Sequence, residues 1–168
     1  MMETAALAVA TAAMAVLMVL AGYFDLKQLR IPNWCVLAVI AVFLVTGLWG
    51  LEFGTYLWRI AHGVIVLFIG FGLYSISGGH VGGGDIKLIA ALTPFIAGQD
   101  LLFVLVVFSI LSLAGVALHR LVRSRLKGPT GWAAMDQKRF FPAGLLLGGT
   151  IMIYLCTTLA GRFVGVAA

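Results

Sequence analysis

The sequence predicts an all-α, polytopic integral membrane protein with about six transmembrane helices. Hydrophobic residues make up 62% of the chain and charged residues only 10%, whereas a soluble protein carries about 25% charged residues. The mean hydropathy is +1.13, and long apolar runs alternate with short polar stretches. Six acidic and eleven basic side chains are too few to cover a soluble surface, and so apolar a chain is not intrinsically disordered.

The length of the chain limits its architecture. A helix needs about 20 apolar residues to cross a bilayer, so 168 residues accommodate roughly six or seven spans joined by short loops. No room remains for a sizeable soluble domain. We therefore expect residues 1–168 to form one membrane-embedded domain.

The first three predicted spans end at polar or helix-breaking residues. The first covers about 5–24 and ends where Asp25 opens a polar stretch. The second covers about 34–51 and is followed by Glu52. The third covers about 56–76 and runs into a cluster of glycines.

The fourth predicted span is short. It covers about 86–97 and contains Pro94, and its twelve residues are too few to cross a bilayer as a straight helix. Either the segment crosses while partly buried in protein or in a thinned membrane, or it forms a re-entrant hairpin. A hairpin would reverse the orientation of everything that follows.

The last two predicted spans flank the most polar part of the chain. The fifth covers about 101–118, and a polar stretch follows over 119–139. The sixth covers about 143–159 and is followed by Gly161 and Arg162.

The distribution of basic residues predicts the orientation. If all six segments cross, nine of the eleven basic residues share one side: Lys27, Arg30, Lys87, Arg120, Arg123, Arg125, Lys127, Lys138 and Arg139. The other side holds Arg59, Arg162, Glu3, Glu52 and Asp100. Cytoplasmic loops are enriched in Lys and Arg, so the nine-base side is predicted to be cytoplasmic. A hairpin would place the most basic loop opposite Lys27 and Arg30, so we favour six spans.

Two acidic residues are functional candidates. Asp25 ends the first span and Asp85 opens the fourth, which puts both at the cytoplasmic boundary. Ionisable groups at membrane depth are costly and often functional. Alternatively, Asp85 is an N-cap, and Asp25 pairs with Lys27 or Arg30. The sequence does not establish that the two carboxyl groups meet.

A glycine cluster precedes Asp85. Five glycines fall within the seven residues 78–84, and ordering glycine costs more backbone entropy than ordering any other residue. The cluster therefore suggests non-helical backbone beside the acid, where a substrate backbone could approach closely. A flexible linker is the alternative. A phosphate-binding loop is disfavoured because the lysine-serine ending and the preceding strand are missing.

Two motifs resemble those of a known family. Gly82-Gly83-Gly84-Asp85 is a GxGD motif, and its continuation Ile86–Leu92 resembles the segment that follows GxGD in bacterial prepilin peptidases. The family's other landmark, an aspartate at the end of a span followed by Ile-Pro-Asn, is matched by Asp25 and 31–33. The chain is therefore similar to prepilin peptidases (type IV leader peptidases) of the GxGD aspartyl protease family.

The resemblance implies an activity and a site. Family members cleave the basic leader from type IV prepilins and pseudopilins, on the cytoplasmic side, after a glycine at the start of the prepilin's hydrophobic helix. Asp25 and Asp85 would be the catalytic aspartates. We expect Gly82, Gly83 and Gly84 to hold the cleaved segment extended, and Lys87 to contact substrate or a lipid headgroup.

The resemblance is to the short form associated with tight-adherence (Flp-type) pili. Longer members carry a cysteine tetrad in an N-terminal insertion and also methylate the new N-terminus. Here only eight residues separate Asp25 from Trp34 and no tetrad is present, so methyltransferase activity is not implied. Archaeal preflagellin peptidases share the motif pair and remain possible.

The expected partners are a prepilin or pseudopilin and membrane lipids, whose anionic headgroups the stretch 119–139 would meet. We expect a multi-pass protein of the bacterial inner membrane that binds no nucleic acid, metal or other cofactor. His80 and His119 lack companion ligands. The oligomeric state is left open. Alternative functions are a non-enzymatic membrane scaffold or a small proton-coupled transporter, whose acids should lie nearer the membrane midplane.

Overall fold

The computed structural model describes residues 2–77, 82–126, 128–137 and 141–166. Within these ranges the chain forms helices, turns and short connections, and no strand. The all-α prediction is therefore confirmed.

Five helices of the described chain are long and apolar enough to cross a membrane. They are α1 (Thr4–Gln28), α2 (Asn33–Gly50), α3 (Phe53–Ile76), α5 (Leu101–Arg125) and α7 (Ala143–Val166). The predicted fourth span is instead the ten-residue helix α4 (Gly83–Leu92), which two 3₁₀ turns, η1 (Thr93–Phe95) and η2 (Gly98–Asp100), connect to α5. The one-turn helix α6 (Ala133–Asp136) lies in the polar stretch before α7.

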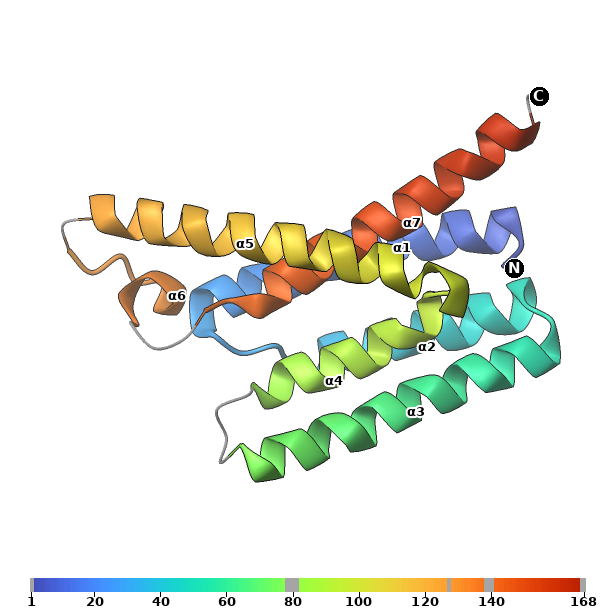
Figure 1. Cartoon of the computed structure of the whole chain (residues 1–168), viewed down its shortest axis with the longest axis horizontal. Coiled ribbons are helices and arrows are strands. Elements are labelled where there is room, and N and C mark those ends of the chain that lie inside the picture. Colours follow the sequence, from blue (N-terminus) through green and yellow to red (C-terminus); the bar gives the residue numbers. More distant parts are fainter. Residues whose placement is uncertain (1, 78–81, 127, 138–140, 167–168) are drawn as a thin grey trace.

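Successive segments run in alternating directions along the bundle (Figure 1). We call the end where α1 finishes and α4 begins the aspartate end, because it carries Asp25 and Asp85. The fourth segment starts there and reaches the opposite end, where the Arg59 guanidinium donates hydrogen bonds to the carbonyl oxygens of Pro94 and Phe95 at 3.3 and 3.2 Å. The segment therefore passes from one end to the other and does not form a re-entrant hairpin.

The two predicted sets of charged residues separate between the two ends of the bundle. The described basic residues of the nine-base set lie toward the aspartate end: Lys27, Arg30, Lys87, Arg120, Arg123 and Arg125. The remaining three, Lys127, Lys138 and Arg139, lie outside the described residues. Glu3, at the opposite end, donates a backbone hydrogen bond to Gly50, which ties the start of α1 to the end of α2.

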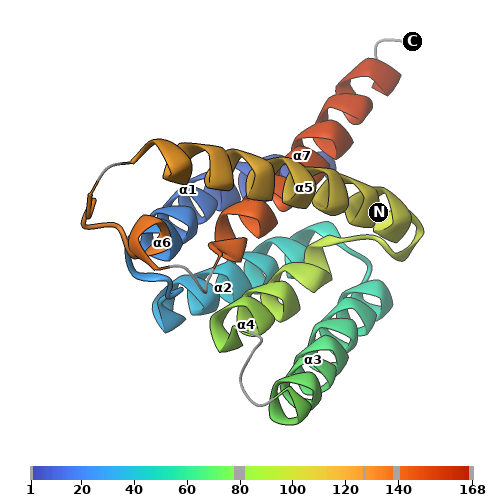
Figure 2. The same ribbon diagram turned by 60° about the vertical axis from the view of Figure 1, so that its left-hand side comes forward.

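The core forms where α1 packs between α7 and α2 (Figure 2). The buried face of α1 includes the small residues Ala6, Ala10 and Ala21, which let neighbouring helices approach closely. At Gly22 the approach is tightest, because a Cβ there would lie 2.9 Å from Leu145 Cδ1 of α7. This close packing holds the last turn of α1 against the first turn of α7.

Candidate active site

Asp25 lies inside the last turn of α1, since the helix continues to Gln28 beyond the predicted end of the span. Its side chain is only 5% exposed. The backbone N–H of Gly144, in the first turn of α7, donates a hydrogen bond of 2.7 Å to Asp25 Oδ2. A buried carboxyl group is thus oriented by a backbone donor from a distant part of the chain.

The alternative in which Asp25 pairs with Lys27 or Arg30 is not supported, since the described residues show no ion pair between them. Lys27 Nζ donates to the hydroxyl oxygen of Tyr23 at 2.9 Å and lies over the Tyr23 ring. The Tyr23 ring in turn makes an edge contact with Trp132 of the polar stretch. Asp25 therefore points into the bundle rather than toward the adjacent basic side chains.

Gly144 leaves room for the Asp25 carboxyl group. A Cβ on Gly144 would lie 2.9 Å from Asp25 Oδ2 and 2.8 Å from Ile31 Cδ1. Both distances are shorter than normal carbon contacts, so a side chain at this position would displace one of the two neighbours. The close approach that makes the hydrogen bond depends on glycine.

Asp85 is the third residue of α4 and is half-buried. Gly82, not Asp85, is the N-cap residue, so the N-cap interpretation of Asp85 is wrong. A Cβ on Gly82 would lie 2.5 Å from Asp85 Oδ2. The carboxyl group therefore folds back over the bare backbone that precedes the helix.

The three glycines before Asp85 have different local structures. Only Gly82 has extended backbone, with φ −66° and ψ 118°, whereas Gly83 and Gly84 are the first two residues of α4. The non-helical backbone expected beside the acid is therefore present at Gly82, whereas Gly83 and Gly84 belong to the helix. A Cβ on either would make ordinary contacts, 3.8 Å from Tyr74 and 3.6 Å from Ile31. Residues 78–81 of the predicted glycine loop lie outside the described residues.

The structure brings Asp25 and Asp85 together. Burial raises the pKa of the Asp85 carboxyl group to about 6, and the negative charge of Asp25 adds to that increase. Ile31 lies beside both Gly84, at the start of α4, and Gly144, which contacts Asp25, and this arrangement brings the two carboxyl groups within electrostatic reach of each other. The juxtaposition that the sequence left open is thus present.

Ile31 connects the two halves of the site. Its buried side chain contacts the start of α7 at Gly144 and the start of α4 at Gly84. Leu29, the C-cap of α1, has left-handed backbone with φ 52°, which turns the chain sharply after α1. Pro32, the middle residue of the Ile-Pro-Asn motif, is the N-cap of α2.

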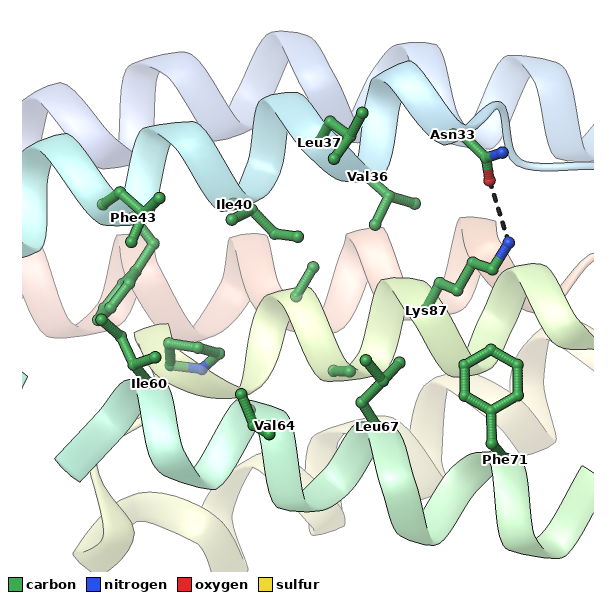
Figure 3. A pocket seen from close by; sticks show the side chains of 15 residues that line it. Asn33, Val36, Leu37, Ile40, Phe43, Ile60, Val64, Leu67, Phe71 and Lys87 are labelled. Atoms are coloured by element: carbon green, nitrogen blue, oxygen red, sulfur yellow. Dashed lines mark hydrogen bonds between the residues drawn. The ribbon is translucent and has the colours of Figure 1, made fainter. Parts of the chain in front are cut away.

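Lys87 lies at the edge of the site rather than inside it. Its Nζ atom donates a hydrogen bond to Asn33 Oδ1 at 3.2 Å, which links the first turns of α4 and α2 (Figure 3). Sequence reasoning gave Asn33 only a role in starting the second span. Its contact with Lys87 depends on two helices that are separated by α3 in the sequence.

Sequence reasoning also missed Gly144. Its one local signal is its position two residues after Pro142, at the start of the last helix. The hydrogen bond to Asp25 spans 119 positions, so no spacing rule indicates it. The other acid of this region, Asp136, accepts hydrogen bonds from Thr130 and Gly131, which lower its pKa.

The described histidines do not gather with other metal ligands. The described residues contain no group of three or more His, Cys, Asp or Glu side chains placed to hold a metal ion. A ring nitrogen of His119 lies 2.8 Å from the carbonyl oxygen of Ala134 in α6. His80 lies outside the described residues.

Comparison with known proteins identifies a relationship for most of the chain. The model of the type IV leader peptidase family matches residues 12–118. The matched range includes both Asp25 and Asp85 but ends before Gly144. Neither the curated proteins nor the solved structures give a match.

Proposed function

The chain belongs to the type IV leader peptidase family, and from this membership we propose that it is an aspartyl endopeptidase with Asp25 and Asp85 as its catalytic pair. The observation that carries the proposal is that two carboxyl groups 60 residues apart in the sequence lie within electrostatic reach of each other at one end of the bundle. Both are partly or fully withdrawn from solvent at one end of the bundle. This arrangement favours peptide hydrolysis over the scaffold and transporter alternatives.

The pair supplies the two groups that peptide hydrolysis requires. Close like charges favour a state in which the two carboxyl groups share one proton. The ionised carboxylate accepts a proton from the attacking water. The protonated carboxyl group donates a hydrogen bond to the carbonyl oxygen of the scissile peptide. Because the proton belongs to the pair, the acid and base roles belong to the pair as well.

The proposed substrate is a type IV prepilin, cut after a glycine at the start of its hydrophobic helix. Gly82, three residues before Asp85, has extended backbone and is exposed, so a substrate segment that has left helical geometry can approach it closely. The basic residues at the aspartate end support a cytoplasmic position for the site, by the preference of Lys and Arg for that side. We infer that cleavage occurs at the cytoplasmic face of the inner membrane.

Prepilins of the tight-adherence (Flp) type are the proposed class. The chain passes from Gln28 at the end of α1 to Asn33 at the start of α2 in a short turn. No additional domain with a cysteine tetrad separates Asp25 from the second helix. This short connection supports a peptidase without methyltransferase activity.

Processing of a Flp-type prepilin in a co-expression assay tests the proposal. The wild-type protein is expected to shorten the prepilin on a gel, and mass spectrometry is expected to place the cut after the glycine. Asp25→Asn and Asp85→Asn should each lower the rate at least about 100-fold, the usual contribution of acid–base catalysis. Asp136→Asn, an aspartate of the same end that lies outside the pair, should process normally.

The outcomes separate the mechanism from the activity. Processing that survives either Asp25→Asn or Asp85→Asn, at normal protein level, would overturn the two-aspartate mechanism. Absence of processing by the wild-type protein across a panel of Flp-type and other type IV prepilins would overturn the proposed activity itself.

A further inference from the structure

An apolar groove of about 470 Å³ lies between α2 and α3, with α4 as its floor (Figure 3). Its α2 wall includes Leu37 and Ile40, and its α3 wall includes Val64 and Leu67. Among the described residues that line it, Lys87 is the only charged one. The groove does not belong to the carboxylate pair, but it begins next to it.

The groove exists because α2 and α3 both pack on α4 and scarcely touch each other. A Cβ on Gly63 would lie 2.9 Å from Pro94 Cγ, and a Cβ on Gly70 would lie 2.4 Å from Ile86 Cγ2. These glycines bring α3 close to α4. Because α4 also packs against α2, it lies between the two helices and keeps α3 apart from α2. The small side chains of Ala90 and Ala91 line the floor, which lets another helix approach closely.

The groove opens at the aspartate end of the bundle, where α4 begins, although neither aspartate lines it. The same short helix carries Asp85 in its first turn and provides the groove floor from Lys87 onward. The hydrogen bond between Lys87 and Asn33 marks the polar mouth (Figure 3). From Lys87 to Pro94 the floor extends roughly 10 Å at the rise of an α-helix, which corresponds to about two helical turns.

We propose that this groove binds the start of the hydrophobic helix of the substrate, so that the peptide bond preceding that helix lies at Asp25 and Asp85. The inference rests on the proposed function. It follows from the position of the cut: a substrate cleaved just before an apolar helix must keep that helix in the membrane beside the enzyme. The groove is apolar, lies beside the start of α4, and leads away from the carboxyl groups toward the opposite end of the bundle.

The specific occupant is a helix rather than a lipid chain. A lipid chain would also fit against the apolar walls, but a lipid has no group that needs to lie near a pair of aspartates. A substrate helix meets both conditions, since its apolar side chains fill the space between α2 and α3 while its unwound beginning reaches Asp85. The small side chains of the floor suit helix-on-helix contact.

Site-specific photo-crosslinking tests the groove directly. A benzoylphenylalanine photo-crosslinker replaces Leu37 or Val64, both exposed side chains of the groove walls. Two exposed control positions in α5 match them in depth. Leu121 lies four residues before the end of α5 at Arg125, as Leu37 lies four residues after the start of α2. Leu113 lies about as far into α5 as Val64 lies into α3, and both helices start at the same end of the bundle.

A tagged Flp-type prepilin is co-expressed with each crosslinking variant in the Asp85→Asn background, so that bound substrate is not consumed. We expect the prepilin to be captured from both groove positions at least fivefold more efficiently than from the controls. Equal or greater capture from the controls would overturn the proposal. So would groove crosslinks that go only to lipid or to a second copy of this chain.

Processing by the wild-type protein, scored on the same gels, separates the two proposals. Processing without groove capture would overturn the groove while the peptidase activity stands. Groove capture without processing would support substrate binding and overturn the activity. As an independent readout, Val64→Trp should raise the KM for the prepilin at least tenfold at normal protein level, whereas Leu113→Trp should leave it unchanged.

Discussion

The backbone N–H of Gly144 donates a 2.7 Å hydrogen bond to Asp25 Oδ2 and so joins two residues that lie 119 positions apart. Through this contact the first turn of α7 orients a carboxyl group at the end of α1. Gly144 lies beyond the range that matches the family model. The C-terminal helix is therefore part of the candidate site although both aspartates precede it.

Gly144→Ala should lower prepilin processing at least about tenfold, the effect of losing about 1.4 kcal/mol of transition-state stabilisation. The added Cβ would lie 2.9 Å from Asp25 Oδ2, so the carboxyl group must move or lose its hydrogen bond. Initial rates in membranes measure the effect. Gly161→Ala is the matched control in the same helix, since a Cβ there meets nothing within 4 Å. Equal activity of the two variants would show that the Gly144 contact does not matter for the reaction.

Gly82→Ala should impair processing by a similar factor of about ten or more. Its Cβ would lie 2.5 Å from Asp85 Oδ2, and its backbone φ of −66° suits alanine, so the effect comes from the carboxyl group alone. Gly72→Ala, in α3, provides the control because the space around it is open. Full activity of Gly82→Ala at normal protein level would contradict this prediction.

The rate of processing should depend on the proton that the pair shares. The pKa of Asp85 is raised to about 6, so above that pH the proton leaves and both carboxyl groups are ionised. No acid then remains for the scissile peptide, and kcat/KM should fall about tenfold per pH unit on the alkaline side. The fall of kcat should begin at a higher pH than the fall of kcat/KM. Bound substrate buries the carboxyl groups further, and this raises the pKa of the pair in the enzyme–substrate complex. A kcat/KM that stays constant from about pH 5 to 8 would refute the shared proton.

Ile31→Ala should destabilise the protein by about 2–5 kcal/mol, as expected for truncation of a buried isoleucine. The Ile31 side chain fills the space between the start of α4 and the start of α7, so its loss should also lower processing. Ile31→Val should cost only about 0.5–1.5 kcal/mol. Thermal unfolding in detergent measures the series. Val19→Ala, which truncates an exposed side chain of α1, should change little, and an equal loss in that variant would argue against a special role for Ile31.

The parts of the site that depend on neighbouring residues in the chain were predictable from the sequence. The two aspartates were candidates because ionisable residues at the ends of apolar spans are costly. The fourth segment was expected to be too short for a straight span, and the structure shows a ten-residue helix with two 3₁₀ turns. The non-helical backbone expected beside Asp85 is found at Gly82, whereas Gly83 and Gly84 continue into α4 and, of these three glycines, only Gly82 lies where a side chain would clash.

The sequence by itself determined the membrane class, the order and direction of the six segments, and the identity of the two candidate aspartates. These follow from hydropathy, charge and motif, which depend on residues near each other in the chain. Only the tertiary structure decided that Asp25 meets Asp85, that Gly144 and Ile31 complete their surroundings, and that a groove opens beside Lys87. These contacts depend on how close the helices approach, and that is set by small residues on separate helices whose pairing no local pattern specifies.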